Sequence, residues 1–139
     1  MVDPAHQAPE LSSVLASAFG AGDGAYAWKK EDLPEVLDQL AAAGMAVVGG
    51  EIWGLRDFEI FGAVPTRQGS TRIFSWSAPP QPPDTGWPTY IRQCLRFAHQ
   101  AIRDLRAEDE VAPRFRDKLV YHLQFMPEAD YPHPGIGSH

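Results

Sequence analysis

Three carboxylates lie close together in the sequence, at Glu51, Asp57 and Glu59. Two carboxylates can act as general acid and general base when both reach the reacting group of a substrate. The chain carries no P-loop, zincin, nucleophile-elbow or kinase signature, and no nucleophile or oxyanion element accompanies these acids. We therefore predict no catalytic residue and a protein that is not an enzyme.

The other side chains with reactive or metal-binding chemistry are scattered. Metal sites need His, Cys or Asp grouped at short spacing, but the five histidines are spread between His6 and His139. His122 falls on an expected strand, where a packed or hydrogen-bonded ring is more common than a metal ligand. Cys94 falls in an apolar helical stripe and is expected to be a buried thiol. The sequence predicts no metal site and no cofactor.

The segment GMAVVGGEIW, residues 44–53, predicts a buried strand that is interrupted by Gly49 and Gly50. Glycine inside a strand usually marks a bulge or a close approach of other backbone. The alternative is that the gap admits a partner, or that a small-molecule-binding domain or minor enzyme uses a pocket beside the two glycines. Because strand side chains alternate, Glu51 and Trp53 share one face beside Gly49.

Large aromatic residues accompany these acids. Tyr26 and Trp28 precede an expected helix, and Trp53 follows Glu51 on the strand. Such rings either fill a core or anchor an interface with another protein. If they anchor an interface, the predicted partner-binding residues are Tyr26, Trp28, Glu51, Trp53, Asp57 and Glu59.

The charge of the chain is unevenly distributed. The net charge is −6, and residues 1–59 hold most of the excess acid. Such a surface disfavours phosphate backbones and attracts a basic partner. A stripe of arginines on the predicted long helix is interpreted as a solvated face, with nucleic-acid binding as the weaker alternative. Without a secretory signal, an apolar span or a second cysteine, we expect a cytoplasmic protein that binds neither nucleic acid nor membrane.

The expected helices follow from caps and periodicity. One helix is predicted between Leu11 and Phe19. The next begins at Asp32, whose side chain can cap it, has Pro34 in its first turn and ends at Gly44 in a left-handed conformation. The longest runs from Trp87 to about Arg106, with apolar residues at every third or fourth position.

The expected strands are 45–53, 58–64, 71–77 and 118–126, the last near the centre of the sheet. The turn-like PTRQGS joins 58–64 to 71–77, so these two are expected to be antiparallel neighbours in a hairpin. We predict an α+β fold, in which about three helices pack on a mainly antiparallel sheet of four or more strands. Residues 1–139 are expected to form a single domain, with loose ends at 1–9 and 127–139.

Two stretches resemble a known family. WKKEDLPEVLDQLAAAGMAVVGGEIW, residues 28–53, is similar to the signature region of immunity protein family 40 of bacterial polymorphic-toxin systems. GWPTYIRQCLRFAHQAI, residues 86–102, is similar to a later helix of that family. The chain departs from the family pattern at Glu51, where aspartate is more common, and at Cys94, where a small hydroxyl residue is expected. The matching positions are Trp28, Asp32, Asp38, Gly49, Gly50, Glu51 and Trp87.

The resemblance implies an immunity protein that binds a cognate toxin domain and neutralises it without catalysis. Many such toxins are basic nuclease-type enzymes, so an acidic inhibitor would meet them quickly by electrostatic steering. The resemblance and the absence of a catalytic set therefore point to the same class of function, a protein–protein inhibitor.

Overall fold

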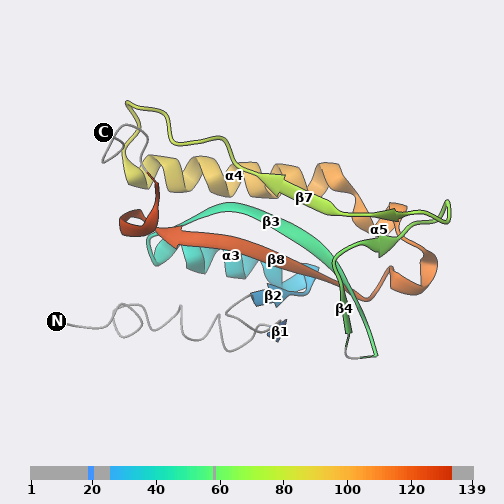
Figure 1. Ribbon diagram of the computed structural model, residues 1–139. Coiled ribbons are helices and arrows are strands. Elements are labelled where there is room, and N and C mark those ends of the chain that lie inside the picture. The colour runs from blue at the N-terminus through green and yellow to red at the C-terminus, as the bar shows by residue number, and fades with distance from the viewer. Residues whose placement is uncertain (1–18, 21–25, 58, 133–139) are drawn as a thin grey trace.

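A computed structural model describes residues 19–20, 26–57 and 59–132. Six antiparallel strands form one curled sheet, in the order β1-β2-β8-β3-β4, with β7 also pairing with β3. This arrangement confirms the predicted α+β class (Figure 1). The strands are β1 (Phe19–Gly20), β2 (Tyr26–Trp28), β3 (Met45–Arg56), β4 (Glu59–Phe61), β7 (Phe74–Ser77) and β8 (Leu119–Pro127).

Two long helices, α3 (Leu33–Ala42) and α4 (Trp87–Leu105), lie on the same face of this sheet, behind it in Figure 1. The strands β5 (Val64–Pro65) and β6 (Thr71–Arg72) form a separate small hairpin. Short helical turns join the larger elements: η1 (Lys30–Asp32), α5 (Ala107–Glu110), η2 (Pro113–Phe115) and η3 (Glu128–Asp130). None of the described helices has the length and apolar composition needed to cross a membrane.

The helix α3 forms where its spacing predicts. Its buried residues Leu33, Val36, Leu37 and Leu40 follow the helical period, and Gly44 has a φ of +82° at its end. One detail of the prediction is wrong: Asp32 lies at the N-cap position but makes no side-chain capping hydrogen bond. The 3-10 turn η1 leads directly into the helix, and the backbone of Asp32 is itself helical rather than extended.

The helix α4 packs its apolar side against the sheet and against α3. Its buried positions are Trp87, Tyr90, Ile91, Cys94, Ala98 and Ile102, as the periodicity predicts. The indole Nε1 of Trp87 donates a hydrogen bond to the carbonyl oxygen of Gly44 at 2.9 Å. The start of α4 is therefore fixed to the end of α3.

The middle strands differ from the prediction. The expected strand 58–64 is divided into β4, which pairs with β3, and β5, which pairs with β6. The expected strand 71–77 is likewise divided into β6 and β7, and β7 pairs with β3. The predicted hairpin between these two segments therefore exists only as the β5–β6 ends, because β3 is long enough to pair with β7 and β4 in succession along one edge.

The ends of the chain also differ. Phe19 and Gly20 form β1 rather than the end of a helix, and residues 11–18 of that predicted helix lie outside the described residues. The expected loose segment 127–139 is ordered in its first part, because β8 extends to Pro127 and η3 follows. Tyr131 packs against both Trp87 and Tyr90, with ring centroids 5.4 Å apart in each pair. Residues 1–9 and 133–139 are not among those described.

Candidate functional site: one face of strand β3

The irregularity in β3 falls at Val48, directly before the glycine pair, whereas Gly49 and Gly50 are themselves paired with both β8 and β7. The register with β8 shifts between Val47 and Gly49. A Cβ atom on Gly50 would lie 2.3 Å from the indole ring of Trp76 and 2.5 Å from the carbonyl oxygen of His122. Both distances are far below van der Waals contact, so only glycine fits here.

The space beside these glycines is occupied by the protein itself. Trp76 of β7 is 9% exposed and lies over Gly50, and its backbone oxygen would be 2.7 Å from a Cβ on Gly49. The small-molecule alternative required an open pocket at this place. The ring of Trp76 fills this space on the Gly50 side of the strand.

Glu51 and Trp53 lie side by side on the other face of the strand, where alternation placed them. The indole Nε1 of Trp53 donates to Oε1 of Glu51 at 3.2 Å. The ring of Trp53 stacks on the imidazole of His122, with centroids 4.6 Å apart and an angle of 7° between the planes. All three side chains are half-buried. We call Glu51, Trp53 and His122 the open-face cluster.

His122 is held in a defined orientation. Its Nδ1 lies 2.9 Å from the backbone oxygen of Tyr26 on β2. Because a carbonyl oxygen can only accept, Nδ1 carries a hydrogen and donates this bond. The expectation of a hydrogen-bonded histidine is confirmed. Sequence reasoning did not include His122 in the site, because only the β3–β8 register shows that it lies opposite Glu51.

The open-face cluster lies on the sheet face that neither α3 nor α4 covers. Ile52 and Tyr121 are paired across β3 and β8 and belong to the core shared with the helices. Glu51 and Trp53 alternate with Ile52 and therefore point away from that core. The cluster thus offers a charge, an indole and an imidazole from two neighbouring strands to anything that approaches this face.

Two of the predicted contact residues belong to the other face. Trp28 is 0% exposed and lies in the core, with its ring 6.4 Å from that of Phe125. Tyr26 is half-buried and stacks on Trp28 at 6.4 Å. The prediction that Trp28 contacts a partner is therefore wrong, because its ring has no accessible surface. Tyr26 reaches the open-face cluster only through its backbone oxygen.

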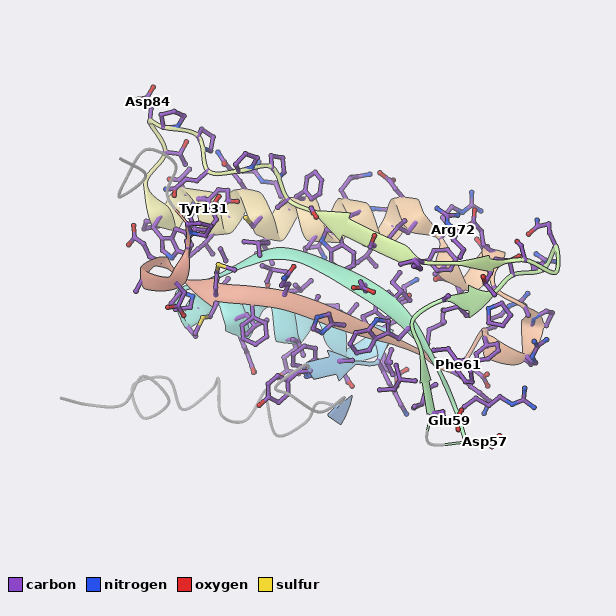
Figure 2. All side chains as sticks on the ribbon, viewed as in Figure 1. Asp57, Glu59, Phe61, Arg72, Asp84 and Tyr131 are labelled. Atoms are coloured by element: carbon purple, nitrogen blue, oxygen red, sulfur yellow. The ribbon has the colours of Figure 1, made fainter. Side chains whose placement is uncertain are left out.

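Asp57 and Glu59 lie at the tip of the β3–β4 hairpin, which projects from the body of the sheet (Figure 2). Both are exposed, and Asp57 has a φ of 52° in the turn, close to Arg56 at 3.6 Å. Glu59 lies opposite Arg56 in the hairpin. Because Arg56 is five positions after Glu51 on β3, roughly 16 Å of strand separate the two glutamates. They are too far apart to act as an acid–base pair on one bond.

The side chains with reactive chemistry elsewhere are buried or dispersed. Cys94 is 1% exposed, and burial raises the pKa of its thiol, so it remains protonated as expected for a structural cysteine. Burial also raises the pKa of Tyr90, whose hydroxyl donates to Pro79. Within the described residues, no three His, Cys, Asp or Glu side chains form a group that could hold a metal ion.

A second concentration of charge lies at the start of α5. Lys30 and Glu108 form an ion pair, and the buried hydroxyl of Tyr121 donates to Glu108 at 3.4 Å. Burial alone would raise the pKa of Glu108, but the hydrogen bond and charge of Lys30 outweigh it and hold that pKa below its ordinary value. Burial, followed by the charge of Glu108, raises the pKa of Tyr121. This group joins α5 to the strand β8 and to η1.

The lowered pKa of Glu108 predicts a pH-dependent contribution to stability. A carboxylate whose pKa is lowered by folding stabilises the folded state above its unfolded pKa, near 4.5, and loses that contribution as pH falls through its folded pKa. We expect Glu108→Gln to lower the free energy of unfolding at pH 7 and to flatten its decline between about pH 5 and pH 3. Urea unfolding at several pH values measures both effects.

Glu128→Gln is the matched control, because Glu128 is exposed and has no ion pair among the described residues. It should leave the pH profile of stability unchanged. Equal profiles for Glu108→Gln and the unmodified chain would show that the Lys30–Glu108 pair does not contribute.

Comparison of the chain with protein-family models, with curated proteins and with solved structures finds no match to any of them.

Proposed function

We propose that this protein is a cytoplasmic immunity protein, a non-catalytic inhibitor that binds a cognate toxin domain through the open-face cluster and the tip of the β3–β4 hairpin. The observation that supports it most is the arrangement of Glu51, Trp53 and His122 on a sheet face that neither long helix covers. The indole is fixed by a hydrogen bond on one side and a stacked ring on the other. Side chains that are already ordered lose little entropy on binding.

The chemistry of this surface fits a basic protein. A lysine or arginine of the partner would meet the carboxylate of Glu51 and the adjacent indole of Trp53, a combination of ion pairing and cation–π attraction. Asp57 and Glu59 extend the negative charge to the projecting tip of the hairpin. Their exposure allows them to steer a basic partner and to raise the association rate more than the final affinity.

The separation of these acids supports inhibition rather than catalysis. Glu51 and the hairpin tip form a strip along β3, which is a geometry suited to an extended protein surface. A catalytic pair would need to converge on one bond. We expect Trp53 to contribute most of the binding energy on this strip, because half-buried tryptophans are frequent hot spots at interfaces.

The proposal predicts a strong effect of charge reversal at Glu51. If a neighbouring reading frame encodes a toxin domain, that domain should form a stoichiometric complex with this chain. We expect Glu51→Lys to weaken that complex by about 2 kcal/mol, or roughly 30-fold in Kd, and to slow association, because a lysine would oppose a cationic partner. Surface plasmon resonance gives both the affinity and the two rate constants.

Asp84→Lys is the matched control, with the same change of charge at an exposed position far from the hairpin (Figure 2). It should leave the dissociation rate unchanged. Unaltered affinity of a folded Glu51→Lys variant would remove the open face from the interface. Turnover of a substrate by the purified chain, traced to its own side chains, would overturn the proposal that it is a binding protein.

A further inference from the structure

The outward side of α4 is basic, although the chain as a whole has a net charge of −6. Arg92, Arg96 and Arg103 are exposed along one ridge of this helix. The four ion pairs formed among the described residues involve other arginines and Lys30, so these three cations are not neutralised by a carboxylate. The nearby acid Asp104 is engaged by Gln100 at 2.8 Å.

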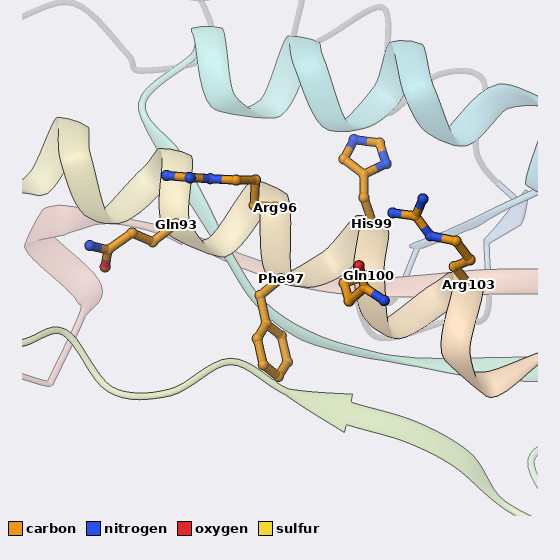
Figure 3. Close-up of a pocket in the computed structure, with 6 residues that line it drawn as sticks. All are labelled: Gln93, Arg96, Phe97, His99, Gln100 and Arg103. Carbon is orange, nitrogen blue, oxygen red and sulfur yellow. The ribbon is translucent and has the colours of Figure 1, made fainter.

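Arg96 and Arg103 border a broad, open depression of about 720 Å³. Figure 3 shows Arg96, His99 and Arg103 leaving the helix on one side, while Phe97 leaves it on the other, toward β7. Phe97 is 37% exposed, which is high for a phenylalanine in a folded protein. The outward side of α4 thus carries, on one side, two arginines with no carboxylate partner among the described residues and, on the other, an exposed aromatic ring.

A small apolar socket adjoins the depression and shares Gln93 and Phe97 with it. Its volume is about 180 Å³, close to that of an apolar cavity of roughly 150 Å³ that holds a benzene ring. One wall is the proline tract 79–82, and the other is α4, with Tyr90, Cys94 and Phe97. The socket is therefore the right size for one aromatic or branched aliphatic side chain.

The socket is held open by a rigid frame. The hydroxyl of Tyr90 donates to the oxygen of Pro79 at 2.7 Å, and the hydroxyl of Tyr131 donates to that of Tyr90 at 3.3 Å. The backbone N–H of Gln81 in turn donates to Tyr131 at 2.8 Å. Because proline fixes φ, this wall is unable to collapse easily into the socket. It also loses little conformational entropy when a ligand binds.

We propose that the outward side of α4 and the adjoining socket bind an acidic peptide segment of a second partner protein, with one aromatic or branched aliphatic side chain inserted in the socket. Charge complementarity identifies the occupant, because arginines with no carboxylate partner among the described residues, on an otherwise acidic molecule, attract carboxylates selectively. The apolar socket favours a peptide over a nucleic acid, because it can hold an apolar side chain but offers no contact to a phosphate. The net charge of −6 also opposes nucleic acid, whose affinity depends on the number of phosphates neutralised.

An NMR titration of the full ¹⁵N-labelled chain tests this inference with three probes at equal salt. The first is a short peptide of alternating Asp and Glu with one central Trp, the second has Ser in place of Trp, and the third is oligothymidine of similar length. We expect the Trp peptide to shift signals of α4 and the proline tract only. We expect it to bind on the order of 10-fold more tightly than the Ser peptide, since a buried aromatic side chain contributes most at such a socket.

Variants separate the two parts of the surface. The double reversal Arg96→Glu/Arg103→Glu should weaken the Trp peptide on the order of 10-fold or more, because like charges then face each other. Phe97→Ala should reduce the difference between the Trp and Ser peptides and leave the salt dependence unchanged. Lys118→Glu is a single-reversal control, since Lys118 is an exposed cation directly before β8, and it should retain the affinity of the unmodified chain.

Three results would overturn the inference. Tighter binding of oligothymidine than of the Trp peptide would assign the surface to nucleic acid. Signal changes of α4 that depend on the concentration of the chain alone would assign it to a second copy. Unchanged affinity of the Trp peptide in the folded double reversal would remove α4 from the site altogether.

Discussion

Replacing Trp28 by alanine is expected to lower the free energy of unfolding by about 3–5 kcal/mol, the usual cost of removing a large aromatic side chain from a core. Trp28 has no accessible surface and packs with Tyr26 and Phe125 in the cluster beneath α3. Equilibrium unfolding in urea measures the loss as a lower midpoint at constant slope.

Trp53→Ala is the matched control, because it removes the same side chain from the open face of the sheet. Trp53 keeps part of its surface in water, so we expect its loss to cost about 1 kcal/mol or less of stability. If the proposed function holds, it should also weaken binding to the proposed toxin partner, as the loss of an interface anchor does. Equal destabilisation by the two substitutions would contradict the assignment of Trp28 to the core and Trp53 to the surface.

The two long helices could be predicted because their determinants are local. The apolar residues of α3 and α4 repeat within each segment, Pro34 and Pro88 occupy first turns, and Gly44 supplies the left-handed end. Each of these features is encoded by residues a few positions apart. The missing capping hydrogen bond of Asp32 shows the limit of this reasoning. A capping pattern considers only Asp32 and the residues after it, whereas the 3-10 turn η1 begins earlier, at Lys30.

The division of the middle strands could not be predicted for the opposite reason. Which strand pairs with which depends on contacts between residues distant in sequence, and β3 is paired with β8 on one edge and with β7 and β4 on the other. Alternation identifies a strand but not its neighbour. The segments 58–64 and 71–77 therefore contain strands, as predicted, but much of each pairs with β3 rather than with the other segment.

The candidate site shows the same boundary between local and non-local information. Alternation correctly placed Glu51 and Trp53 on one face, but it could not state that His122 would complete the cluster from β8. The strand β2 has only three residues, which is too short for alternation to predict the face of the sheet on which Trp28 lies. A short aromatic pair next to a helix has no internal signal that separates a core from an interface.

The two proposed surfaces lie on opposite sides of the sheet. The open-face cluster points away from the helices, whereas the outward side of α4 is the outermost layer behind the sheet. Their charges also have opposite sign, so each attracts a class of partner that the other repels. Occupants of the two surfaces would therefore not compete for space, and simultaneous binding of a basic and an acidic partner is expected if both proposals hold.

Gly50→Ala is expected to destabilise the fold by about 3 kcal/mol, the upper end of the usual cost of overpacking. The new Cβ would lie 2.3 Å from the ring of Trp76 and 2.5 Å from the oxygen of His122. The ring belongs to the core cluster and is 9% exposed. The oxygen belongs to the backbone of β8, the paired neighbour of β3, so it can move only if the ladder between the two central strands is distorted.

Gly62→Ala is the control for this substitution, because Gly62 is exposed and a Cβ there would meet nothing within 4 Å. It should change stability by no more than about 0.5 kcal/mol. The double variant Gly50→Ala/Trp76→Leu separates the two clashes, since leucine removes the indole but leaves the oxygen of His122 in place. We expect a coupling energy of about 1 kcal/mol between the two sites, and strict additivity in urea unfolding would mean that the backbone clash alone requires a glycine at this position.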